Sequence, residues 1–315
     1  MSTVTLVVSL PRSGTQRTAY LLNKVYGEAA TVVHEPIRHN YLPTRYYRDY
    51  ERVERQLERP EIAAHIDWIK KQDERPYIEL SWQNYAAIPL FAKEFGDRLR
   101  VVHIYRHPVL NCFSLLTHRF NYPTALHRDE SRDLLSPDRH RMLSTERAGH
   151  WADMSPYEKC LVYWLELNRY VNELRERYPE VPIIDVSAES LFNETSETLG
   201  RIAEFAGLDR RELQEADRKR RVDRFSSRAV MVADWRLIFD YPEVVACARS
   251  LGYDFEGITQ EGLIARYGPR KYPRVKFAAY RVFAKHPKLF HLLRRSRDSL
   301  TKRGSVKTNR GFVES

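Results

Sequence analysis

The chain has 315 residues, of which 43% are hydrophobic and 30% charged, a balance that argues against an intrinsically disordered protein. No apolar run reaches the roughly 18 residues of a membrane-spanning helix, and no signal-peptide pattern precedes the first expected strand, so we expect a cytoplasmic protein. The net charge of +10 is uneven, because the chain after residue 265 carries 15 Lys and Arg against only Asp298 and Glu314. The remainder, with 37 basic and 40 acidic residues, is close to neutral, and we therefore expect no nucleic acid as a partner.

The chain opens with a strand, a tight loop and a helix. Residues 4–10 are apolar and rich in β-branched side chains, which predicts a buried strand, and helical spacing of apolar residues follows residues 11–16. A helix start presents unpaired N–H groups, so this loop suits an anion such as phosphate. It is not a Walker A loop, since it has no Lys and its cation, Arg12, precedes Gly14.

A second short strand, residues 31–33, ends in His34-Glu35-Pro36. Open α/β sheets bind ligands at the carboxyl ends of their strands, which places a carboxylate close to the first loop. We expect Glu35 to accept a proton from a reacting hydroxyl, with a solvated acid or an ion-pair partner as the alternative. His34 is the alternative base, although alternation along a strand predicts that it faces the opposite way.

The middle of the chain repeats the strand–helix pattern. Residues 41–72 are expected to form helices that cover one face, and residues 77–81 a third strand that is followed by Trp82, which either stacks on an acceptor or packs in the core. Residues 101–105 predict a fourth strand, with Arg106 at its end. Pro108 suits the first turn of the next helix, and Ser114 falls about two turns into it.

Two of these junctions resemble a known family. PRSGT after the first strand and YRHPVLNCFS after the later one resemble the sulfotransferases that use 3′-phosphoadenosine-5′-phosphosulfate (PAPS), in their bacterial carbohydrate and tyrosylprotein branches. The resemblance implies that the 5′-phosphosulfate is bound by the first loop and the 3′-phosphate by the second junction. The cofactor-binding residues that it implies are Arg12, Ser13, Gly14, Thr15, Gln16, Arg106 and Ser114. It also implies that Glu35 is the catalytic base and that Arg12 assists catalysis.

The chain departs from that family at two places. No His stands near the third strand, where cytosolic members carry a catalytic one, which strengthens the case for Glu35. Ala188 stands where an adenine-contacting Tyr is common, so adenine recognition is left unassigned.

The second half of the chain contains an irregular insertion, a long helix and a fifth strand. Residues 121–156 break the periodicity and suggest a lid on the acceptor side, and residues 156–178 predict the helix. Residues 181–186 predict the strand, and further helices run to residue 254. The tail, residues 266–315, suggests a basic amphipathic helix that either contacts an anionic membrane surface or packs on the domain.

The sequence thus predicts an α/β fold, a P-loop-type parallel sheet of about five strands with helices on both faces in residues 1–265, plus the basic helical tail. The expected activity is sulfuryl transfer from PAPS, without a metal, to a hydroxyl of a carbohydrate or other polar small molecule. Two alternatives remain open: a nucleotide kinase or other phosphotransferase, and a non-catalytic membrane- or glycan-binding protein that uses the tail. The oligomeric state is not readable from the sequence.

Overall fold

The computed structural model describes residues 2–37, 43–72, 74–118, 120–121, 135–137, 140–144, 150–214, 229 and 233–268. Most of the expected lid and of the basic tail lie outside these residues, so both stay predictions. The first tail residues, Arg266 and Tyr267, belong to a helix that the periodicity did not indicate.

A five-stranded sheet forms the centre of the molecule, and every pair of neighbouring strands is parallel, as predicted. The strands are β1 (Val4–Ser9), β2 (Thr31–His34), β3 (Tyr77–Leu80), β4 (Leu99–Tyr105) and β5 (Ile183–Ser187), in the spatial order β2-β3-β1-β4-β5. The strands that follow β1 in the chain, β2 and β3, lie on one side of it, and β4 and β5 lie on the other. A topological switch point therefore lies at the carboxyl ends of β1 and β4, where such sheets bind their ligands.

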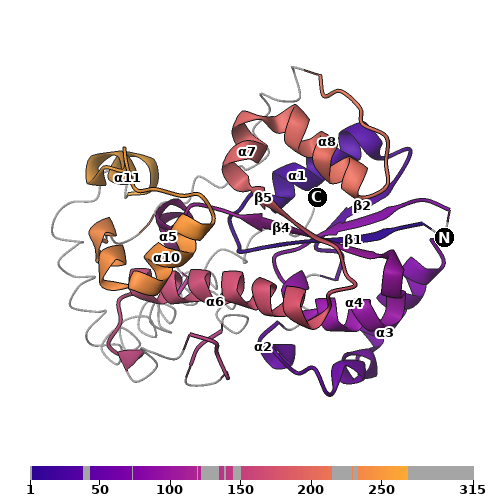
Figure 1. The fold of residues 1–315 in the computed structure, drawn as a ribbon, viewed down its shortest axis with the longest axis horizontal. Coiled ribbons are helices and arrows are strands. Elements are labelled where there is room, and N and C mark those ends of the chain that lie inside the picture. Colours follow the sequence, from indigo (N-terminus) through magenta and orange to yellow (C-terminus); the bar gives the residue numbers. More distant parts are fainter. Residues whose placement is uncertain are drawn as a thin grey trace, which may run out of the picture.

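Helices cover both faces of the sheet, which explains why its strands are buried on both sides (Figure 1). One face carries α1 (Thr15–Tyr26), α7 (Ala188–Asn193) and α8 (Thr195–Phe205). The other carries α3 (Pro60–Lys70), α4 (Ile88–Phe95), α5 (Pro108–Thr117) and α6 (Pro156–Arg177). Side chains of β1 alternate between the two cores, with Leu6 and Val8 in one and Val7 in the other.

Shorter elements complete the described part of the chain. These are α2 (Pro43–Tyr46), α10 (Pro242–Ser250), α11 (Gln260–Tyr267) and the 3-10 turns η2 (Val53–Glu58), η3 (Asn84–Ala86), η4 (Gly96–Arg98) and η8 (Trp235–Asp240). The helix expected after the fifth strand is divided into α7 and α8. Among the helices of the described residues, none is both long enough and apolar enough to cross a bilayer.

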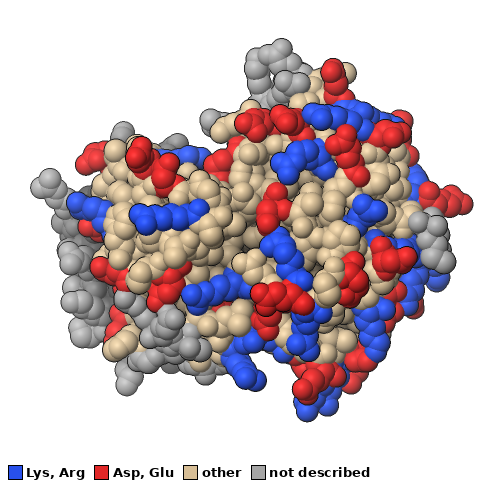
Figure 2. All heavy atoms as spheres, viewed as in Figure 1, with Lys and Arg blue, Asp and Glu red and all other residues tan. Residues whose placement is uncertain are grey.

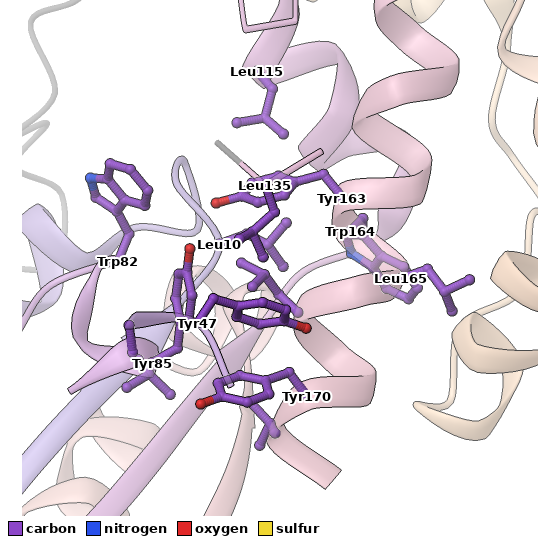
Figure 3. Packing of buried hydrophobic residues seen from close by; sticks show 14 of the residues in the cluster. Leu10, Tyr47, Trp82, Tyr85, Leu115, Leu135, Tyr163, Trp164, Leu165 and Tyr170 are labelled. Carbon is purple, nitrogen blue, oxygen red and sulfur yellow. The ribbon is translucent and has the colours of Figure 1, made fainter. Parts of the chain in front are cut away.

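The long helix α6 begins at a capping box, in which the Ser155 hydroxyl accepts from the Glu158 N–H and the Glu158 carboxylate accepts from the Ser155 N–H. Its inner face supplies much of the aromatic core, including Tyr163, Trp164 and Tyr170 (Figure 3). The start of α6 agrees with the helix that the sequence predicts from residue 156.

A buried carboxylate on α6 anchors segments that are far apart in the sequence. Glu166 is fully buried and accepts the N–H groups of Leu143 and Ser144, both at 2.8 Å, as well as the hydroxyl of Tyr47. Burial and the adjacent Glu166 charge raise the pKa of Tyr47. This carboxylate therefore anchors Leu143, Ser144 and Tyr47 to α6, in the core on the face of the sheet that α6 covers.

Charged side chains of both signs are interspersed over the face that Figure 2 shows. This mixture agrees with the near-neutral composition of the chain before residue 266. Attraction of an anionic ligand must therefore come from the local placement of cations and helix ends.

Candidate functional site

The loop between β1 and α1 adopts a backbone that most side chains avoid. Arg12 has φ 71° and Gly14 has φ 97°, both in the left-handed region, where a non-glycine residue is uncommon. The positive φ favours glycine at position 14, and a Cβ atom placed there would also make a tight 3.1 Å contact with the exposed Phe192 ring. A strained turn of this kind at the carboxyl end of a central strand is typical of ligand-binding loops.

Arg106, at the end of β4, is bonded directly to this loop. Its Nη1 donates to the carbonyl oxygen of Arg12 at 2.6 Å, and Arg12 in turn donates from Nε to the hydroxyl of Ser114 at 3.3 Å. The two strand–helix junctions that the sequence indicated therefore lie in contact at the carboxyl ends of β1 and β4.

Asn111 is a further loop contact, which the sequence analysis missed. This fully buried side chain on α5 donates from Nδ2 to the carbonyl oxygen of Pro11 at 3.1 Å and to the hydroxyl of Ser13 at 3.3 Å. Its place one turn before Ser114 was visible in the sequence, but nothing there pointed to a partner a hundred residues earlier. The Asn111 side chain therefore holds the β1–α1 loop in place through these two hydrogen bonds.

The N-terminus of α1 begins directly after the loop, in the same region. Thr15 is the first residue of the helix and Gln16, which follows, is exposed. Within the described residues, no side chain caps this end at Gly14, and its first turn contains no acidic residue. The positive end of the helix dipole is thus available to an anion, next to the guanidinium groups of Arg12 and Arg106.

Glu35 and His34 lie on the other side of the loop, at the end of β2. Glu35 has left-handed φ of 46°, and its N–H donates to the carbonyl oxygen of Leu80 at 3.1 Å. This turn interrupts the alternation of the strand, so the expectation that His34 and Glu35 face opposite ways is wrong. His34 Nε2 lies 3.9 Å from Glu35 Oε1 and 3.4 Å from Thr15 Oγ1.

Burial lowers the pKa of His34, although the neighbouring Glu35 charge acts in the opposite direction. The imidazole is therefore neutral at neutral pH and can exchange a hydrogen bond with the Thr15 hydroxyl. About a quarter of the His34 side chain and a third of the Glu35 side chain are exposed, so both can reach a bound molecule. The site contains two candidate bases, one anionic and one neutral.

Hydrogen bonds from neighbouring elements hold Arg106 and His107, the two residues that follow β4. Trp164 Nε1 donates to the carbonyl oxygen of Arg106 at 2.9 Å, and only 7% of Arg106 is exposed. His107 caps α5, since its Nδ1 accepts from the Val109 N–H while Nε2 donates to the carbonyl oxygen of Asp254 at 2.8 Å. These contacts require the neutral Nε2–H form, and burial lowers the pKa of His107 accordingly.

Tyr267 is the most distant residue that the structure adds to the site. Its hydroxyl oxygen accepts from Arg106 Nη2 at 3.0 Å, and the side chain is buried. The two residues are 161 positions apart, and no sequence pattern connects them.

Packing decides the role of Trp82, which the sequence left open, and also the role of Cys112. Trp82 is 8% exposed and packs edge-to-face on Phe120, which favours the packing interpretation over acceptor stacking. Cys112 is fully buried and burial raises its pKa well above the ordinary value, so it is a packed thiol rather than a nucleophile.

No family model matches the chain, and no curated protein matches it in sequence. Several solved structures do resemble the chain. One of them is the sulfotransferase domain of the Synechococcus PCC 7002 olefin synthase, which is 16% identical in sequence. The match covers 81% of this chain and 97% of that domain, with a TM-score of 0.46. The sulfotransferase of Alicyclobacillus acidocaldarius gives 13% identity, coverage of 81% and 97%, and a TM-score of 0.45. Mouse sulfotransferase SULT7A1, complexed with PAP, gives 16% identity, coverage of 84% and 88%, and a TM-score of 0.43.

At these identities and TM-scores the likeness carries no argument about function, which has to rest on the site itself. The chain is nevertheless similar to structures of the same family that its two strand–helix junctions resemble in sequence, the sulfotransferases.

Proposed function

We propose that the chain is a PAPS-dependent sulfotransferase, which moves a sulfuryl group to an acceptor hydroxyl. The observation that carries the proposal is the hydrogen bond between Arg106 Nη1 and the carbonyl oxygen of Arg12, which makes the two junctions one site. PAPS has phosphate groups at both ends of its ribose, and a site for it must present anion-binding groups to both. The residues present fit this demand, since guanidinium groups and an uncapped helix N-terminus lie side by side.

In this proposal the N–H groups at the start of α1, with Ser13 and Thr15, bind the 5′-phosphosulfate. They stabilise the charge that develops on the phosphate as its bond to sulfur breaks. Arg106 and Ser114 bind the 3′-phosphate and fix the register of the nucleotide. Arg12 connects the two groups, because its carbonyl is held by Arg106 and its side chain by Ser114.

Glu35 accepts the proton of the acceptor hydroxyl while the new sulfur–oxygen bond forms. His34 keeps the end of β2 close to Thr15 and provides a neutral second acceptor for the proton. A base between the loop and the solvent suits in-line attack on a sulfate held by α1. The acceptor proposed is a hydroxyl of a carbohydrate or another polar molecule, as the resemblance to the bacterial branch implies.

The proposal is tested first by nucleotide binding. Calorimetric titration of the wild-type protein with adenosine 3′,5′-bisphosphate and with adenosine 5′-monophosphate should show a preference for the bisphosphate. A charge-assisted hydrogen bond contributes about 1.5–3 kcal/mol, which corresponds to at least about a tenfold difference. Arg106→Ala should erase the preference, and Arg106→Lys, which keeps the charge and fills more of the space, should retain part of it.

Equal affinity of the wild-type protein for the two nucleotides would overturn the proposal. Incubation with PAPS and a panel of hydroxyl compounds then identifies the acceptor by the mass gain of one sulfuryl group. Transfer from ATP in place of PAPS would indicate a phosphotransferase instead.

A further inference from the structure

Tyr267 belongs to the last helix that the structure describes, and its hydroxyl contacts Arg106, which is proposed to bind the 3′-phosphate. α11 packs on α5, and the Tyr267 ring lies 6.3 Å from the ring of Phe113, the residue immediately before Ser114. The backbone of Tyr267 is also held, since its carbonyl oxygen accepts the N–H of Ala229 at 2.8 Å. The hydroxyl is therefore fixed beside Arg106, one of the residues that are proposed to bind the 3′-phosphate.

The direction of the bond to Arg106 decides what this hydroxyl can do. A guanidinium group only donates, so the Tyr267 oxygen is the acceptor in the 3.0 Å contact with Arg106 Nη2. The proton of the hydroxyl is not used in that contact and can be donated to an oxygen anion. The guanidinium of Arg266, 5.2 Å from the Tyr267 ring centroid, adds a further positive charge next to it.

We infer that Tyr267 is a donor-nucleotide-binding residue, which donates its hydroxyl proton to the same phosphate that Arg106 binds. The inference rests on the proposed function, because it requires a ligand with a phosphate at this end of the site. It assigns α11, the last helix that the structure describes, to the nucleotide site, although the motifs that indicated this site lie in residues 11–15 and 105–114. The helix thereby becomes part of the recognition of the 3′-phosphate.

The test is Tyr267→Phe, which removes one oxygen and leaves the buried ring in place. Its affinity for adenosine 3′,5′-bisphosphate should fall about tenfold, as expected for loss of a hydrogen bond to a charged group. Its affinity for adenosine 5′-monophosphate should stay within about twofold of wild type, because that nucleotide has no phosphate at this position. The ratio of the two affinities is a readout that a purely structural role would not change.

Tyr241→Phe is the matched control, since the Tyr241 hydroxyl donates to Glu158 Oε1 at 2.8 Å and not to Arg106. The control should keep the wild-type ratio. A wild-type ratio in Tyr267→Phe would overturn the inference while leaving the proposed function intact. Failure of the proposed function is a different result, in which the wild-type protein itself shows no preference for the bisphosphate.

Discussion

The exchange of one oxygen for nitrogen in Glu35→Gln tests the chemistry of the site most directly. Gln keeps the shape of the side chain and can still form hydrogen bonds, but it cannot accept a proton at neutral pH. Loss of a general base typically lowers turnover by about 10²- to 10⁴-fold. This range corresponds to about 2.7–5.4 kcal/mol in the activation free energy, at 1.36 kcal/mol for each factor of ten.

The structure places the expected value near the lower end of that range. His34 Nε2 lies 3.9 Å from the Glu35 carboxylate, and burial keeps the imidazole neutral, so it can take over part of the proton transfer. We therefore expect a loss of about 10²-fold in Glu35→Gln and a larger loss in the double variant with His34→Gln. The loss should be smaller for a phenolic acceptor than for an alcohol, because a more acidic hydroxyl needs less help from a base.

The assay is single-turnover transfer from PAPS to an alcohol acceptor, with Glu28→Gln as the control. Glu28 is exposed and lies in the turn between α1 and β2, at the end of the strands opposite to the site, and its variant should turn over like the wild-type protein. The free energy of unfolding of Glu35→Gln should stay within about 0.5 kcal/mol of wild type, since the side chain is partly exposed. A turnover within threefold of wild type for the alcohol would refute the assignment of Glu35 as the base.

The remaining predictions concern stability. Asn111→Ala removes two buried hydrogen bonds to the loop and leaves the Pro11 carbonyl without a donor, so the free energy of unfolding should fall by about 2–4 kcal/mol in denaturant titrations. The exposed Asn193→Ala serves as its control, and similar midpoints for the two variants would contradict the bracing role. Stability should also decline as the pH falls below 6.5, the ordinary pKa of His, because burial lowers the pKa of His34 and His107 and the unfolded chain binds more protons there. His107→Asn keeps a helix cap and should flatten this decline between pH 7 and 5, whereas an unchanged slope in that variant would show that His107 does not cause it.

Sequence patterns were sufficient for the elements and for the two junctions. Buried β-branched runs indicated the strands, and Pro108 marked where a helix begins, because these signals act within a few residues of the chain. The strictly parallel sheet followed from the alternation of strands and helices. For the same reason the loop at Gly14 and the junction at Arg106 could be named before their geometry was known.

The contacts that turn these parts into a site depended on the tertiary structure. The left-handed turn at Glu35, which brings His34 to the same side, is a backbone conformation that no residue type at that position announces. Asn111 and Tyr267 reach partners 98 to 161 residues away, and the sequence carries no local signal for such distant contacts. The sequence by itself determined which segments become strands, helices and anion-binding loops, since those preferences are local. Only the tertiary packing, which places α5 beside the β1–α1 loop and α11 beside α5, decided which side chains meet at the carboxyl ends of β1 and β4.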